Sequence, residues 1–214
     1  MTQVRLKSLI LIFVALMTMV VLAACGSSGQ PAGDQGSQEK AQQETPDKQV
    51  APAQVAQESD RGVAAVEPPP NDMMKLTIPQ MRRIENDEIP TGPATDERLF
   101  HDYAAVHLKR TGYPWEKEAN VYIAGHRLGY ENTDSYLAFW DLNKLEEGDE
   151  FYITDSQGRK YTYEVFRKFI AGPENLSVLA PVDGRNVVTL QTCTLPDYMN
   201  RLLVRGELKE IKGA

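Results

Sequence analysis

The sequence predicts an all-β domain, a closed barrel or sandwich with a few short helices, in the later part of a 214-residue chain. Short β-branched or apolar runs recur between turn-forming residues from Leu76 onward, and only two segments have the character of helices. Every aromatic residue except Phe13 lies at or beyond Phe100. The side chains needed for a packed core therefore belong to residues 76–214.

The predicted elements follow one another along this domain. Asp155–Gly158 supplies turn residues for a β-hairpin. Two segments, Asp96–Val106 and Ser135–Leu145, are expected to form short helices. The predicted strands are Leu76–Pro79, Asn120–His126, Phe151–Thr154, Tyr161–Ile170, Asn186–Cys193 and Arg201–Leu208.

The segment 26–75 has the composition of a disordered linker. It has no aromatic residue, eight Gln and six Pro, including three consecutive prolines at Pro68–Pro70. Such a segment cannot bury enough apolar surface to offset the entropy lost on ordering. We therefore expect residues 26–75 to form a flexible spacer.

Residues 1–25 resemble an export signal. Arg5 and Lys7 precede a 16-residue apolar run, Leu9–Ala24, which is shorter than the roughly 20 residues of a membrane-spanning helix. The run ends in Leu22–Cys25, which resembles a bacterial lipobox whose cysteine, Cys25, is lipidated. The alternative is an uncleaved membrane anchor with an incidental cysteine. Both interpretations tether the domain to the outer face of the membrane.

Composition excludes several classes of function. The net charge of −7 and the pI of about 5.1 argue against a nucleic-acid-binding protein, which usually carries a basic face. Two cysteines and three histidines are too few for a disulfide scaffold and leave little for a zinc centre. We therefore expect no metal site.

Three residues are candidates for chemistry. Cys193, at the end of a predicted strand, is either a nucleophile or a buried structural thiol. His126 ends another strand beside a glycine, where it can face a groove, whereas His101 and His107 are expected to be surface or half-buried residues. Arg201 begins the strand after Cys193, and an antiparallel hairpin would set the two side by side. Its guanidinium is then either an oxyanion donor or a solvent-facing charge.

Several motifs together resemble the sortase family. Thr189–Cys193 is similar to the sortase signature Thr-Leu-x-Thr-Cys, and Ala124–Arg127 resembles the family's histidine motif. Arg201–Val204 resembles its arginine-bearing final strand. Leu76–Pro79 and Ser177–Pro181 are similar to its opening strand and to the segment before the cysteine strand. The pattern is most like class E, with class D next.

The resemblance implies an eight-stranded β-barrel and a cysteine transpeptidase. Cys193 would attack a C-terminal sorting signal between Thr and Gly, with His126 as acid and base and Arg201 at the oxyanion. Tyr113 and Thr192 are the expected substrate-binding residues. The implied partners are secreted proteins with a sorting motif and an amine of the cell-wall precursor or of a pilin. This chemistry requires no cofactor.

Two features depart from the family pattern. A lipobox is unusual in a sortase, and Thr111–Trp115 differs from the expected Gly-Pro-rich stretch before the histidine strand. Two other functions remain open. One is a different cysteine amide-exchange enzyme, such as an L,D-transpeptidase, although those place His and Cys close in sequence and here they are 67 residues apart. The other is a non-catalytic lipoprotein that binds peptides, although all three candidate residues are present.

Overall fold

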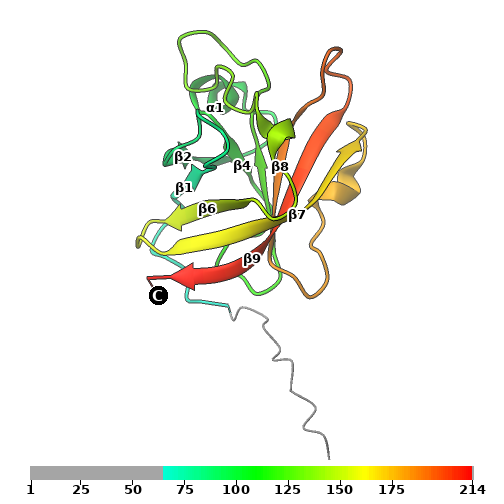
Figure 1. The fold of residues 1–214 in the computed structure, drawn as a ribbon. Coiled ribbons are helices and arrows are strands. Elements are labelled where there is room, and N and C mark those ends of the chain that lie inside the picture. Colours follow the sequence, from blue (N-terminus) through cyan, green and yellow to red (C-terminus); the bar gives the residue numbers. More distant parts are fainter. Residues whose placement is uncertain (1–64, 214) are drawn as a thin grey trace, which may run out of the picture. The chain divides into compact units, whose positions relative to one another are not determined.

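The computed structural model describes residues 65–213, which are mostly strands and turns (Figure 1). This part of the chain contains one short α-helix, α1 (Glu97–Asp102), and two 3-10 helices, η1 (Leu142–Lys144) and η2 (Leu176–Leu179). None of its helices has the length and apolarity to cross a membrane. The strands are β1 (Met74–Thr77), β2 (Asp87–Ile89), β3 (Thr91–Gly92), β4 (Val106–Leu108), β5 (Asn120–Ala124), β6 (Glu150–Asp155), β7 (Lys160–Ala171), β8 (Val187–Cys193) and β9 (Arg201–Lys212).

One sheet contains all these strands in the order β2-β1-β6-β7-β9-β8-β5-β4-β3. Its two end strands, β2 and β3, are consecutive in the chain and are separated only by Pro90, which has no N–H to donate to a ladder. The Pro90 carbonyl still accepts a bond of 2.9 Å from the His107 N–H of β4. Segment 87–92 thus pairs with β1 and with β4, and brings the sheet close to a closed barrel. With β2 and β3 counted as one interrupted strand, the expected eight-stranded barrel is confirmed.

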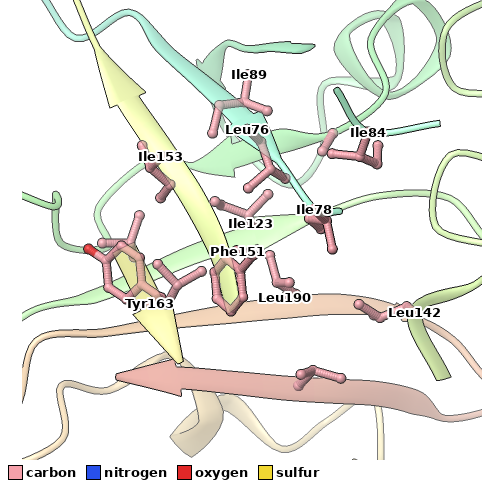
Figure 2. Close-up of a cluster of buried hydrophobic side chains, with 14 of the residues drawn as sticks. Leu76, Ile78, Ile84, Ile89, Ile123, Leu142, Phe151, Ile153, Tyr163 and Leu190 are labelled. Atoms are coloured by element: carbon pink, nitrogen blue, oxygen red, sulfur yellow. The ribbon is translucent and has the colours of Figure 1, made fainter. Parts of the chain in front are cut away.

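Alternation along the strands separates two apolar layers. The larger fills the barrel, where Leu76, Ile123, Phe151, Ile153 and Leu190 converge from four strands (Figure 2). Tyr122 and Leu203, of the opposite parity, form a smaller buried cluster on the outer face of the sheet with Ala171. Ala171 reaches this face because the register of β7 shifts between Val165 and Arg167. Val178 and Leu179 of η2 pack against this cluster, so the segment between β7 and β8 covers part of the outer face.

The second predicted helix, Ser135–Leu145, is wrong apart from the three residues of η1. Leu137 has a positive φ of 55°, which an α-helix does not tolerate. Its N–H donates to Leu128 O at 2.6 Å, and the Phe139 N–H donates to His126 O at 3.0 Å. The apolar residues that suggested a helix are instead a series of turns bound to the segment after β5.

Several other elements differ from prediction. The predicted strand Asn120–His126 ends at Ala124, so His126 lies just beyond β5. Helix α1 ends at Asp102 rather than Val106, because Val106 begins β4. Strands β2, β3 and β4 were not predicted, since each has two or three residues and no alternation long enough to detect.

The folded part also begins earlier than Leu76. Strand β1 starts at Met74, and the Val66 N–H donates to Trp115 O at 3.2 Å. The guanidinium of Arg159, itself buried, donates to Glu67 O at 2.7 Å. Residues 66–75 therefore pack on the barrel through backbone groups that composition does not reveal. The predicted export signal, Cys25 and the linker up to residue 64 lie outside the described residues.

Candidate active site

Strands β8 and β9 place Cys193 and Arg201 opposite each other. Their antiparallel ladder ends in the pair Cys193–Arg201, so these two residues flank the connecting loop. The Thr194 N–H donates to Asn200 O at 2.9 Å, and the Asn200 N–H returns a bond of 3.2 Å to Thr194 Oγ1. The loop is thus closed at its base, which fixes the backbone positions of Cys193 and Arg201 relative to each other.

His126 reaches the same place from β5. Strand β5 runs parallel to β8, with Ala124 beside Gln191, and the Gly125 N–H continues the ladder to Gln191 O at 3.0 Å. The Thr192 hydroxyl donates to Gly125 O at 2.8 Å. This register, extended by two residues, places His126 alongside Cys193.

Gly125 is required by the close packing at this point. A Cβ there would lie 2.8 Å from the Phe139 ring and 2.9 Å from Ala104 O. Only glycine lets the chain pass between these groups and present His126.

Cys193, His126 and Arg201 line one cavity of about 460 Å³, a volume typical of ligand sites. One wall is apolar and is built largely from η2 and the segment before it, with Leu176, Val178 and Leu179. Tyr122 lies in the floor, where its hydroxyl donates to Gln191 Oε1 at 2.6 Å. The cavity therefore joins a nucleophile, a titratable ring and a cation to an apolar surface.

Burial controls the ionisation of two groups in the cavity. It lowers the pKa of His126 because the charged imidazolium loses hydration. It raises the pKa of Tyr122 to about 12, against the opposing fields of Arg205 and Arg201. Tyr122 is therefore a neutral hydrogen-bond donor at neutral pH, and the neutral form of His126 is favoured.

The two arginines of β9 have different surroundings. Arg201 donates through Nη1 to Tyr198 O and Asn200 O, both at 3.3 Å. A guanidinium has five N–H donors, so Arg201 retains others for a ligand in the cavity. Arg205 instead donates to Thr189 Oγ1 at 3.1 Å and to Val178 O at 2.9 Å. Arg205 binds η2 through Val178 O, whereas Arg201 lines the cavity.

A sortase-domain family model matches residues 76–209, a range that includes His126, Cys193 and Arg201. The chain belongs to the sortase family. A curated relative of this sortase, sortase A of Streptococcus agalactiae serotype III (strain NEM316), is 30% identical over 91 residues. That match covers 42% of this chain and 36% of the relative, so it spans about a third of the relative's length.

Solved sortase structures resemble this domain over most of its length. Sortase A from Corynebacterium diphtheriae, in its lid-mutant form, has a TM-score of 0.56 and 27% identity, covering 67% of this chain and 73% of that one. Sortase C-1 from Actinomyces oris has a TM-score of 0.53 and 31% identity, covering 64% and 73%. These relatives are named sortases A and C, so they do not specifically support the expected likeness to class E.

Two expected substrate-binding residues occupy different positions in this sortase. Thr192 lines the cavity, but its buried hydroxyl is bonded to Gly125 O and holds the histidine segment. Tyr113 is not brought to the cavity. Its ring stacks on Trp115 at 4.7 Å, and its hydroxyl donates to Asp72 Oδ2 at 3.5 Å. The geometry thus gives Tyr113 a packing role beside the N-terminal segment.

The prediction for His107 was wrong, because its side chain is fully buried. Its Nδ1 accepts from the Thr91 hydroxyl at 3.1 Å, and its Nε2–H donates to Gly112 O at 3.0 Å. Within residues 65–213, no group of three His, Cys, Asp or Glu side chains is arranged to hold a metal ion.

Sequence reasoning missed several residues of the cavity. Tyr122 was detectable, since it lies on the same strand face as Ala124 and His126 by the period of two. Phe100 and Tyr130 reach the cavity through tertiary packing, and no local pattern marks them. The family resemblance marked Ser177–Pro181, which overlaps η2, but gave no sign that this segment lines the cavity.

Proposed function

We propose that this sortase is a cysteine transpeptidase that exchanges one amide bond for another through a thioester on Cys193. The direct pairing of Cys193 with Arg201, in one cavity with His126, carries the proposal. A thiol supplies the nucleophile, an imidazole transfers the proton and a guanidinium stabilises the oxyanion.

The first half-reaction forms the thioester. The Cys193 thiolate attacks the Thr carbonyl carbon of a sorting signal, and Arg201 donates to the resulting oxyanion. The carbonyl re-forms as the C–N bond to Gly breaks, and the His126 imidazolium gives its proton to the departing amine. Because burial lowers the pKa of His126, only a minor part of the enzyme holds the imidazolium at neutral pH.

The second half-reaction returns the enzyme to its starting state. An acceptor amine attacks the thioester, neutral His126 takes the amine proton, and the C–S bond breaks to release the Cys193 thiolate. One amide is lost and one is formed, so the exchange needs no cofactor or external energy source.

The proposed donor is a secreted protein with a C-terminal Leu-Pro-x-Thr-Gly or Leu-Ala-x-Thr-Gly signal. The apolar wall formed by Leu176, Val178 and Leu179 suits its leucine side chain. The acceptor is an amine of a cell-wall precursor or a pilin, and the enzyme works at the outer face of the membrane. On its motif pattern, which is most like class E with class D next, we propose that the enzyme is of class E.

Mass spectrometry of the full-length protein tests this function. Incubation with peptides containing Leu-Pro-Ala-Thr-Gly or Leu-Ala-Ala-Thr-Gly should add an acyl group that hydroxylamine removes. The Cys193→Ala variant should show no adduct and no cleavage. Cleavage by that variant would refute the mechanism, and binding without cleavage by the native protein would favour a non-catalytic peptide-binding protein.

We further propose that Cys25 is lipidated and that residues 1–24 are removed. The basis is the lipobox-like sequence Leu22–Cys25 after an apolar run. The intact mass of protein extracted from membranes should correspond to a chain beginning at a diacylated Cys25. A mature chain that retains Met1 would instead establish an uncleaved anchor.

A further inference from the structure

The imidazole of His126 lies between two aromatic rings from separate segments. Phe100 of α1 contacts it with ring centroids 5.9 Å apart and an interplanar angle of 68°. Tyr130, in the loop after β5, contacts it at 5.5 Å and 83°. Near-perpendicular contacts at these separations are a favoured geometry for aromatic pairs. The orientation of the His126 ring is therefore restrained on two sides without the use of its nitrogen atoms.

The loop that carries Tyr130 is itself fixed. The Tyr130 N–H donates at 3.2 Å to the hydroxyl of Ser135, which is fully buried. Gly129 has a φ of +67°, and a Cβ at this position would overlap the Ser135 carbonyl group. On the outer side of Tyr130, the His101 ring packs at 4.6 Å, and Asp102 Oδ1 lies 2.7 Å from His101 Nδ1.

Core packing does not explain these two aromatic residues. Tyr130 is 47% exposed and Phe100 is half-buried, and neither belongs to the buried clusters of the barrel. Both line the cavity with His126.

Such rings have two electrostatic consequences for the imidazole. They remove water from it, which disfavours the cation, but their negative faces attract a cation that lies against them.

We propose that Phe100 and Tyr130 are positioning residues, which orient the His126 ring toward the leaving amine. They also stabilise its imidazolium form more than apolar side chains without a ring would at the same burial. This inference rests on the proposed function, which makes His126 the proton donor. The other titratable or charged groups that line the cavity or lie on α1 and the loop around His126 are Glu97, Arg98, His101, Asp102, Tyr122, Arg127, Glu131, Asp134, Cys193 and Arg201. All are retained in the variants below, so a change in titration reports the loss of a ring.

Kinetics of full-length variants test the positioning role. Phe100→Leu and Tyr130→Leu should each lower kcat by about tenfold with KM within about twofold, because a misoriented proton donor slows chemistry more than binding. Tyr130→Phe, which keeps the ring, should stay within about threefold of the native enzyme. Tyr136→Leu is a matched control on the same loop, since the Tyr136 ring contacts Arg83 and not His126. An equal loss of kcat in this control would show a structural effect and overturn the proposal.

Proton NMR titration of the His126 Cε1–H gives a second readout, with the resonance assigned by its loss in His126→Gln. Leucine keeps the site apolar but lacks a ring quadrupole, so Tyr130→Leu should lower the pKa of His126 by about half a unit. Tyr130→Phe should leave it near the native value. An unchanged or raised pKa in Tyr130→Leu would overturn the electrostatic part of the proposal.

The two proposals fail in different ways. Absence of a Cys193 thioester in the native protein refutes the transpeptidase function and, with it, a role for the rings in catalysis. A thioester that forms at the native rate in both leucine variants refutes the positioning role and leaves the function intact.

Discussion

Cys193 and Arg201 are direct cross-strand partners at the end of the β8–β9 ladder, whereas Arg205 is the partner of Thr189 four residues away. Both arginines lie on the same strand face, so alternation cannot distinguish them. Register does, because four residues correspond to about 13 Å along a strand. Of these two arginines, only Arg201 is placed to donate to the oxyanion of the proposed reaction at Cys193.

Replacement of Arg201 should therefore impair chemistry. We expect Arg201→Ala to lower turnover by about 10²-fold or more, the scale of a lost oxyanion donor. Arg201→Lys should recover only part of this loss, since a point charge does not reproduce the guanidinium fork. Arg205→Ala should keep turnover within a few-fold at saturating peptide, with any larger effect on KM because Arg205 supports η2. A folded Arg205→Ala enzyme with lower turnover than Arg201→Ala would contradict this assignment.

The Thr192 hydroxyl connects the cysteine strand to the histidine segment through Gly125 O. Thr192→Val keeps the shape but leaves that buried carbonyl without its donor. We expect kcat to fall by about tenfold, the kinetic equivalent of a lost hydrogen bond that aligns two reacting groups. Thr192→Ser retains the hydroxyl and should stay close to native. Equal activity of the Val and Ser variants in steady-state peptide cleavage would show that the bond does not position His126.

His107 makes stability depend on pH. Burial lowers its pKa from 6.5 to about 4, and its neutral form makes bonds at both ring nitrogens. Between these values the unfolded chain binds a proton that the folded chain does not, so stability falls as pH decreases from about 6.5 to 4. The full difference is about 3 kcal/mol. Urea unfolding at pH 7, 5.5 and 4.5 should show a shallower pH dependence for His107→Gln than for the native chain. An equal pH dependence in the two chains would contradict this role of His107.

The segment that precedes β1 should contribute to stability and not to catalysis. A chain beginning at Asn71 keeps β1 but loses the Val66 and Glu67 backbone bonds, and it leaves the buried Arg159 guanidinium without one acceptor. We expect a loss of about 2–4 kcal/mol in the free energy of unfolding relative to a chain beginning at Ala65.

Catalysis by the shorter chain should be preserved at temperatures where it is folded. Arg159 precedes the first residue of β7. The active site lies at the other end of this strand, where its last residue, Ala171, is opposite Arg201. Eleven residues of strand separate these ends by roughly 35 Å. Equal unfolding midpoints in urea for the two chains would show that the barrel is complete without residues 65–70.

Much of the site was predictable because strand periodicity and short connections carry it. Cys193 and Arg201 are separated by a short loop between two strands, which allows one dominant register, and the pairing follows from that register. The three motifs also led to the family, and the family model covers the same residues. The helix predicted over Ser135–Leu145 failed because its apolar residues satisfy contacts with the segment after His126, which no local rule includes.

The sequence by itself determined the all-β class, the strands that carry Cys193 and Arg201, the strand that leads to His126, and the order of the motifs. These features depend on neighbours within a few residues and on a period of two. Tertiary structure decided which distant groups share the cavity: Phe100 and Tyr130 around His126, η2 above Tyr122, and Arg159 on the N-terminal segment. Their separation along the chain leaves no periodic signal, because such contacts form only once strand pairing between distant segments has brought them together.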